Sequence, residues 1–125
     1  MLKIQRFVFS PFYENTYLIW DESSKDAAVI DPGCYDSNEK ETLDKFVEKE
    51  FLQIKYLINT HCHIDHIFGN AYLKKKYYSI LLLPEKDLFM LDLMIDAAKS
   101  YGVEFTPSPK PDKLINDTEQ LILGD

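Results

Sequence analysis

The chain has 125 residues, of which 46% are hydrophobic and 14% are aromatic. This length suits one domain or part of one, and the hydrophobic share excludes a disordered tail. The formal net charge of −7 argues against a general affinity for nucleic acid or for anionic membrane surfaces, so we expect neither as a partner.

The sequence carries no sign of export or membrane insertion. Residues Met1–Arg6 alternate polar and apolar side chains, unlike the continuous apolar segment of a signal peptide. No stretch approaches the roughly 20 apolar residues that a membrane crossing needs. We therefore expect a cytoplasmic protein. Two cysteines, Cys34 and Cys62, are too few for a disulfide framework, and we expect both to be reduced.

The first third of the chain predicts β-structure. Apolar and polar residues alternate from Leu2 to Phe9, and Pro11 interrupts the pattern. A second strand is predicted at Thr16–Trp20 and a third at Ala27–Ile30, with a polar turn between them. The third strand stops at Asp31-Pro32-Gly33.

The pattern then changes to helices that alternate with short buried strands. A helix is expected from a cap at Ser37 or Asn38 to about Glu50. The bounded apolar run Ile54–Ile58 predicts a buried strand, and all three histidines of the chain follow it within residues 61–66.

Further elements continue this alternation. A helix is predicted at Ala71–Tyr77 and a buried strand at Ile80–Leu83. The longest helix is expected at Glu85–Tyr101, closed by Gly102, and one more strand at Leu121–Leu123. Strands that alternate with helices indicate an α/β layered domain.

The loop His61-Cys62-His63-Ile64-Asp65-His66 is expected to bind metal. Imidazole and carboxylate groups are the ligands that suit Zn²⁺ and related divalent ions. In an extended segment His61, His63 and Asp65 share one face, and His66 diverges where the backbone turns. The loop follows a buried strand, which would hold the ligands in place, so metal binding explains the cluster better than surface histidines do. On the same alternation Cys62 points away and is expected to be a packing residue.

The motif His-x-His-x-Asp-His is the signature of the metallo-β-lactamase superfamily, and the chain resembles the N-terminal portion of its glyoxalase II-like members. Similarity extends to Glu14–Ile19, to Ala28–Gly33 and to the tail Asp117–Asp125. The resemblance implies an αββα sandwich. Residues 1–125 would supply roughly the first half of a single such domain, as a mixed β-sheet with flanking helices.

The resemblance also implies a binuclear metal site, with zinc as the expected ion and iron or manganese as alternatives. His61 and His63 would belong to the first metal, and Asp65 and His66 to the second. A metal-activated hydroxide would be the nucleophile, and Asp65 would orient it and take part in proton transfer. Asp31 is similar to an aspartate that supports the ligand loop, although a turn residue before proline is an equally good interpretation.

The complete family site needs ligands that this chain lacks. The family adds a later histidine, a bridging aspartate and a final histidine, and no histidine follows His66 here. Asp112, Asp117 and Asp125 do not lie in the motif that supplies the bridging aspartate. We therefore expect the chain to be a fragment of a longer polypeptide or to self-associate, and to have little activity alone.

Three functions are compatible with these residues. The leading hypothesis is a metal-dependent hydrolase of a small-molecule thioester or ester. One alternative is an iron-dependent oxidoreductase of the same superfamily, similar to persulfide dioxygenases or flavodiiron proteins. Another is a non-catalytic binding module that retains the loop. A nuclease is less attractive, because the chain is acidic and lacks a basic groove.

Overall fold

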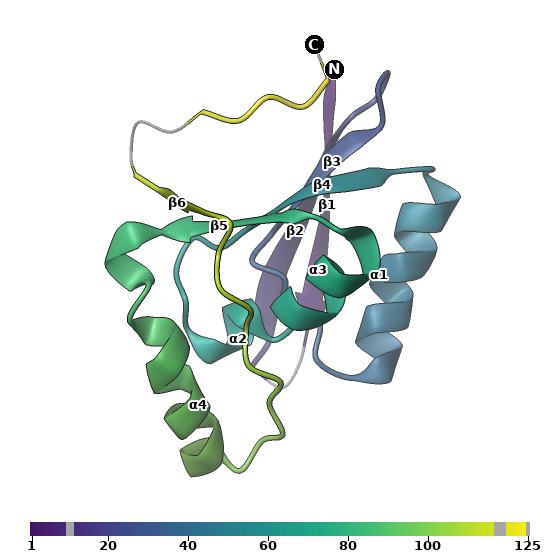
Figure 1. The fold of residues 1–125 in the computed structure, drawn as a ribbon. Helices are drawn as coiled ribbons and strands as arrows, with labels where there is room; N and C mark the ends of the chain where they lie inside the picture. Colours follow the sequence, from purple (N-terminus) through teal and green to yellow (C-terminus); the bar gives the residue numbers. More distant parts are fainter. Residues whose placement is uncertain (10–11, 117–119, 125) are drawn as a thin grey trace.

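The computed structural model describes residues 1–9, 12–116 and 120–124. The predicted interruption at Pro11 and the residues Asp117 and Asp125 lie outside these ranges. Within the described residues, six strands form one sheet in the order β1-β2-β3-β4-β5-β6, so neighbours in space are also neighbours in the chain (Figure 1). The α/β class expected from the alternating pattern is confirmed.

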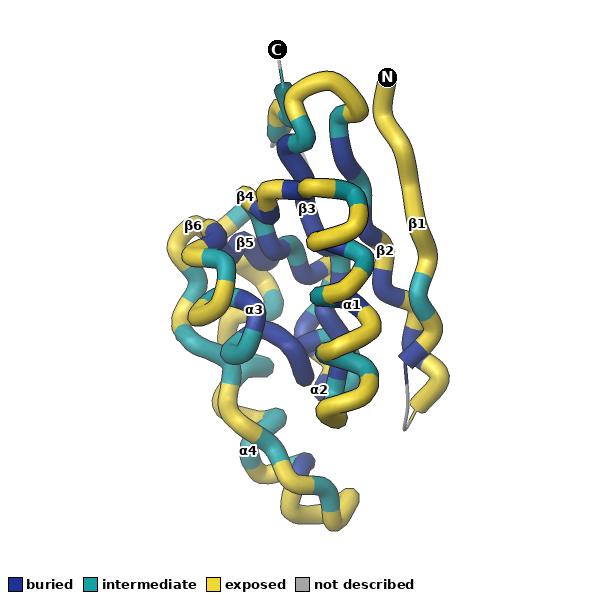
Figure 2. The backbone as a smooth tube through the Cα atoms, turned by 90° about the vertical axis from the view of Figure 1, so that its right-hand side faces the viewer, coloured by how far each residue is buried: buried dark blue, intermediate teal, exposed yellow. Residues whose placement is uncertain are grey.

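The first three strands are antiparallel. They are β1 (Leu2–Phe9), β2 (Glu14–Asp21) and β3 (Asp26–Ile30), close to the segments predicted from alternation. Along β2 the period of two sends Leu18 and Trp20 into the core, while the intervening side chains face the other way. Figure 2 shows β1 as an edge strand that is exposed over most of its length.

The other three strands run parallel to β3. They are β4 (Gln53–Ile58), β5 (Ile80–Pro84) and β6 (Lys113–Ile115). The sequence did not predict β6, because three residues after a proline-rich connector carry no periodic signal. The predicted strand Leu121–Leu123 is wrong: this segment has no ladder partner and lies irregularly against the open face of the sheet.

The helices all lie on one face of the sheet. They are α1 (Ser37–Lys49), α2 (Ile64–Ile67), α3 (Asn70–Tyr77) and α4 (Met90–Tyr101), with a 3₁₀ turn at Glu85–Asp87. Each connects parallel neighbours, and connections of this kind share one hand, so successive crossovers return to the same side. Figure 1 shows α1, α2, α3 and α4 together below the sheet, as this rule requires.

The two longer predicted helices differ from the structure at their starts. Asp36, and not Ser37 or Asn38, caps α1: its backbone is extended and its Oδ1 accepts the N–H of Glu39 at 2.8 Å. The helix expected from Glu85 is broken into the 3₁₀ turn and α4. The 3₁₀ turn places the Asp87 carboxylate where it accepts the backbone N–H of Cys62 at 3.1 Å.

The hydrophobic core lies between the sheet and the helices. Leu18, Val29, Leu57 and Leu81 from four neighbouring strands are completely buried, and Leu43 of α1 packs on them. Burying one such side chain contributes about 1.5–3 kcal/mol. This core makes β3 and β4 rigid, and these two strands lead into the loops that carry the functional residues.

The opposite face of the sheet is apolar and only partly covered. Leu2 and Ile4 of β1 and Ile80 of β5 are 58%, 65% and 45% exposed. The C-terminal segment Leu121–Leu123 crosses this face and lines a groove with Ile58. None of the helices in the described ranges combines the length and apolar character that a membrane crossing requires.

Helices α1 and α3 are joined through one carboxylate. Asp44 on α1 accepts hydrogen bonds from the hydroxyl groups of Tyr72 and Tyr77, the latter at 2.5 Å, and from Lys76 at 2.8 Å. Three donors from α3 therefore meet at one partly buried acceptor. The contact fixes α3, which follows the histidine loop directly in the chain.

We expect Asp44→Ala to lower the free energy of unfolding by roughly 1–3 kcal/mol, because it leaves the partly buried Tyr77 hydroxyl without its acceptor. Urea unfolding followed by circular dichroism measures this change. Glu41→Ala is the matched control on the same helix, since its exposed pair with Lys45 contributes less than about 1 kcal/mol. Equal losses for the two variants would contradict this role of Asp44.

Candidate metal centre

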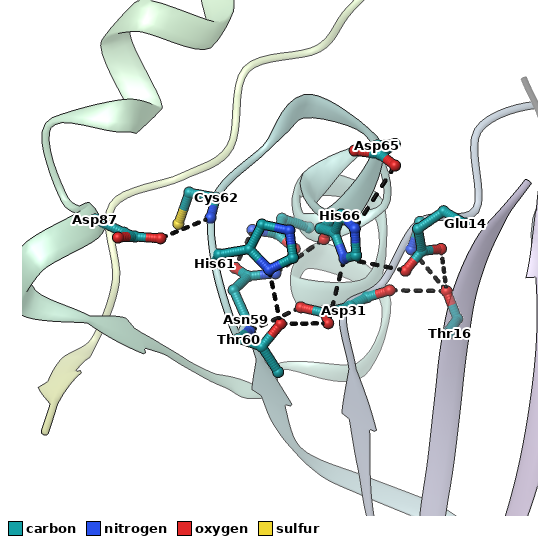
Figure 3. A network of polar contacts seen from close by, with 12 residues as sticks. Glu14, Thr16, Asp31, Asn59, Thr60, His61, Cys62, Asp65, His66 and Asp87 are labelled. Atoms are coloured by element: carbon teal, nitrogen blue, oxygen red, sulfur yellow. Dashed lines mark hydrogen bonds and ion pairs between the residues drawn. The ribbon is translucent and has the colours of Figure 1, made fainter. Parts of the chain in front are cut away.

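The candidate site lies where two parallel strands end. β3 leads into Asp31, and β4 leads through Asn59 and Thr60 into His61. In open α/β sheets the carboxyl ends of parallel strands are the usual place for a functional site. Figure 3 shows Asp31, His61 and His66 converging at this edge.

Asp31 clamps the ends of the two strands together. Its Oδ1 accepts the backbone N–H of Thr60 at 2.7 Å, and its Oδ2 accepts the Thr60 hydroxyl at 2.6 Å. The backbone of Asp31 has φ of 55°, in the left-handed region that aspartate tolerates better than most residues. The two interpretations of this residue are therefore compatible: it forms the turn before Pro32, and its carboxylate supports the loop.

Close polar contacts at Nδ1 orient the two histidines that approach each other most closely. The His61 and His66 rings lie 4.0 Å apart. Nδ1 of His61 is 3.0 Å from the Thr60 hydroxyl, and Nδ1 of His66 is 3.2 Å from Oδ2 of Asp31. In both rings the Nδ1 side faces a protein partner, so Nε2 is the atom left for a metal ion.

The remaining predicted ligands surround these two rings. The His63 ring lies 4.9 Å from that of His61, and Asp65 Oδ2 lies 3.6 Å from Nε2 of His66. The extended geometry expected for the loop ends at His63, because α2 starts at Ile64. Asp65 and His66 are therefore presented from a helical turn, and the structure brings all four predicted ligands to one edge of the sheet.

The helical turn is anchored from below by apolar and amide side chains. Ile64 and Ile67 of α2 are buried. Nδ2 of the completely buried Asn59 donates to the His66 carbonyl oxygen at 2.9 Å, and Nδ2 of Asn70 donates to Oδ1 of Asn59 at 2.8 Å. Sequence reasoning missed this amide pair, because a single asparagine after a strand looks like an ordinary turn residue.

Glu14 is another residue of the site that sequence reasoning missed. Its side chain is only 1% exposed, and its Oε1 lies 3.4 Å from Nδ1 of His66. Burial raises the pKa of Glu14 to about 8, although the hydrogen bond from Thr16 and the nearby His66 act in the opposite direction. The available signal was a charged residue at a core-facing position of a strand.

The electrostatics of the two close histidines differ. Burial lowers the pKa of His61 below its usual value, and the neighbouring His66 lowers it further. Burial acts in the same direction on His66, but the close Asp31 carboxylate and the other surrounding carboxylates outweigh it and raise the pKa. Several carboxyl groups therefore surround His66, and their negative charge would also favour a bound cation.

These residues fit a divalent metal ion. One ligand atom each from Asp31, His61 and His66 lie within 4.8 Å of one another. Both oxygens of Asp31 already accept hydrogen bonds, so we assign it a supporting role and assign metal binding to the imidazole Nε2 atoms. His63 and Asp65 add an imidazole and a carboxylate beside them.

Cys62 does not face this donor set. It is completely buried and packs with Ile67 and Leu83 beneath the loop. Burial raises the pKa of its thiol to about 12, and the Asp87 carboxylate adds to this shift. A thiol in this state is a poor ligand, because metals bind the thiolate. Its buried position agrees with the packing role expected from alternation.

An apolar pocket of about 300 Å³ opens beside His63 and Asp65. Its other walls come from Phe12, from α2 and from α4, and none of the residues that line it is a lysine or an arginine. They are Phe12, Ile64, Met90, Met94 and Tyr101. The pocket suits an uncharged, apolar group placed next to the ligand atoms.

Comparison with protein families gives one match that covers most of the chain. The model of the metallo-β-lactamase superfamily matches residues 10–123. The chain is 31% identical over 123 residues to hydroxyacylglutathione hydrolase GloC of Haemophilus influenzae, which covers 97% of this chain and 55% of that protein. The chain thus spans about half the length of this relative.

A second match covers a shorter part of the chain, and the matched protein has a different activity. Over 60 residues the chain is 42% identical to the human mitochondrial persulfide dioxygenase ETHE1, which is 47% of this chain and 22% of that protein.

Solved structures share the fold over nearly the whole chain. The BLEG-1 B3 metallo-β-lactamase superposes with a TM-score of 0.80 at 22% identity, covering 98% of this chain and 57% of the other. TTHA1623 in a di-iron-bound form superposes with a TM-score of 0.78 at 26% identity, covering 94% and 56%. The predicted fold, of which this chain supplies about half, is confirmed.

The buried carboxyl of Glu14 predicts how stability depends on pH in the metal-free protein. Its pKa is higher in the folded state, about 8, than the usual 4.5, so folding favours the protonated form. The stabilising contribution is complete below about pH 4.5 and is lost as the pH rises through about 8. The raised pKa of His66 acts in the same direction.

We therefore expect the unfolding free energy of the metal-free protein to fall from about pH 5 to about pH 8, by on the order of 1 kcal/mol per pH unit. Glu14→Gln removes the titrating group and should flatten most of this slope. Urea unfolding in the presence of a chelator measures both proteins. Parallel pH profiles would show that Glu14 does not titrate in this window.

Proposed function

Since this chain belongs to the metallo-β-lactamase superfamily, we propose that it is part of a metal-dependent hydrolase that cleaves a thioester or an ester. The observation that carries the proposal is the orientation of His61 and His66, whose Nδ1 atoms face protein partners while their Nε2 atoms remain available. The glyoxalase II-like subgroup is supported by the identity to a hydroxyacylglutathione hydrolase across 97% of the chain.

We assign the predicted ligands to two neighbouring cations. His61 and His63 would hold one, and Asp65 and His66 the other, with zinc as the preferred ion because imidazole and carboxylate ligands suit it. Such cations, when bound, lower the pKa of water toward neutrality and polarise a carbonyl group. Asp65 is 23% exposed at the mouth of the site and would also accept a proton there.

The apolar pocket supports a substrate with an uncharged acyl group. Its methionine walls, Met90 and Met94, are flexible and adapt to groups of different shape. The carboxylate of Asp65 and the lack of a lysine or arginine in the lining disfavour an anionic group in this pocket. We therefore place the acyl side of the thioester here and the polar thiol part elsewhere in the complete protein.

We further propose that residues 1–125 form the N-terminal part of a single domain. The support is the chain's span of 55% of its hydrolase relative, together with a sheet face on which Leu2 and Ile4 are exposed. The remaining ligands, and the cover for this face, would come from the rest of a longer polypeptide or from self-association. The 125 residues alone would then have little activity.

A second candidate is an iron-dependent oxidoreductase of the same superfamily. Two observations favour it: the 42% identity to a persulfide dioxygenase over 60 residues, and the close superposition on a protein solved in a di-iron-bound form. The same four side chains would bind iron. We rank this function second, because the similarity to the dioxygenase covers only 47% of the chain.

The two functions predict different reactions from the complete protein. As a hydrolase it should release thiol from an acylglutathione or a simple acyl thioester without consuming oxygen. His63→Ala, which removes one ligand, should lower kcat/KM by about 100-fold or more. A thiol-reactive dye and an oxygen electrode measure the two reactions. Glu41→Ala, on the exposed face of α1, is the control and should be unaffected. Oxygen uptake with a persulfide, and no thioester cleavage, would exclude the hydrolase.

A further inference from the structure

We propose that Glu14 is a positioning residue that fixes the His66 imidazole from the side opposite its metal-binding atom. Glu14 touches neither the substrate pocket nor the proposed metal positions, and it would act through His66. The inference rests on the proposed metal centre, but the hydrogen bond that it requires can form with or without a metal ion.

The first support is a pair of buried atoms that face each other. Among the described residues, two buried side-chain atoms lack a hydrogen bond, namely Glu14 Oε1 and His66 Nδ1. They lie 3.4 Å apart. One is an acceptor and the other can carry a proton, so a small movement of the ring would bring them within the usual range for a hydrogen bond. Two buried groups of complementary chemistry then satisfy each other.

The second support is the way the Glu14 carboxyl group is held. Thr16 Oγ1 lies 2.8 Å from Glu14 Oε2 and 2.7 Å from the Asp31 carbonyl oxygen, and it accepts the N–H of Gly33 at 3.1 Å. The Thr16 hydroxyl therefore links Glu14 to the turn that presents the Asp31 carboxylate. This contact holds the Glu14 side chain in one position, as is required of a residue that orients a metal ligand.

The third support is the space that the chain leaves for this carboxyl group. A Cβ on Gly33 would lie 2.1 Å from Glu14 Oε2 and 2.6 Å from the Asp65 carbonyl oxygen. No real side chain fits at these distances. Gly33 and Glu14 are therefore matched: the missing side chain at one position makes room for the buried carboxyl group at the other, directly behind α2.

Asp31 alone leaves the His66 ring only partly fixed. Its Oδ2 lies 3.2 Å from Nδ1 of His66, but the same atom also accepts the Thr60 hydroxyl at 2.6 Å. Glu14 Oε1 has no other hydrogen bond, so it can serve His66 fully. Metal-binding histidines donate their second ring N–H to such acceptors, which sets the ring orientation and affects metal affinity.

The test compares Glu14→Leu with Glu14→Gln in the complete protein. Leucine removes the acceptor, whereas glutamine keeps a carbonyl oxygen that can face His66. We expect Glu14→Leu to weaken Zn²⁺ binding by roughly 10–100-fold in chelator competition, while Glu14→Gln stays within about threefold of the natural protein. Gly33→Ala should also weaken Zn²⁺ binding, because its Cβ would displace the carboxyl group and would press on the carbonyl oxygen of Asp65.

A second measurement needs no metal ion. In the metal-free protein, above the pKa of His66, NMR should detect a slowly exchanging Nδ1–H proton on this ring in the natural protein and in Glu14→Gln. The signal should broaden or disappear in Glu14→Leu. If the natural protein shows this signal, Glu14→Leu loses it and neither protein binds Zn²⁺, the proposed metal centre fails and the role of Glu14 stands.

Two outcomes would overturn the role of Glu14. One is a folded Glu14→Leu protein that binds Zn²⁺ as tightly as the natural protein and keeps the Nδ1–H signal. The other is a folded Glu14→Gln protein as weak as Glu14→Leu, which would show that the negative charge matters and the acceptor does not. If leucine prevents folding, Glu14→Ala, which also removes the acceptor, takes its place in both measurements.

Discussion

The site depends on the clamp that Asp31 forms with Thr60. Two hydrogen bonds, at 2.7 and 2.6 Å, tie the end of β3 to the end of β4. They fix where the chain leaves β4 and so where His61 begins. The same carboxylate also faces His66, which lies in α2. One side chain therefore sets the entry to the loop and contributes to the orientation of its last ligand.

The fold explains why this clamp is possible. β3 and β4 are parallel neighbours, and residues 28–30 of β3 pair with residues 56–58 of β4. Their carboxyl ends therefore meet at the same edge of the sheet. The completely buried side chains of Val29 in β3 and Leu57 in β4 keep that edge rigid. The crossover through α1 returns the chain beneath the sheet. The ligand loop and α2 therefore start at a fixed position, and little ordering remains to be done when a metal ion binds.

Local patterns predicted much of this arrangement, and long-range contacts explain the rest. The strands around Leu18, Val29 and Leu57 follow from alternation or from short apolar runs, and the ligand loop follows from residue types and spacing. β6 and the break after Asp87 depend on partners that are distant in sequence, Leu82–Pro84 and Cys62. The cap at Asp36 was missed because three adjacent polar residues, at positions 36–38, could each have capped α1.

Glu14 and the pair of Asn59 with Asn70 were missed for a related reason. A buried carboxyl group at the start of a strand, or two amides eleven residues apart, become meaningful only when the fold brings them to His66. Spacing identifies residues that share one short segment. It does not reveal hydrogen-bond acceptors that lie on other strands, and these acceptors orient the histidines.

X-ray absorption spectroscopy at the edge of the bound metal, on the purified complete protein, tests the central claim most directly. If His61, His63, Asp65 and His66 form the site, the first coordination shell contains only nitrogen and oxygen, at about 2.0–2.2 Å for zinc. A sulfur ligand at about 2.3 Å would contradict the account. If Cys62→Ser removes this sulfur, then Cys62, which is buried beneath the loop in this structure, turns to bind the metal.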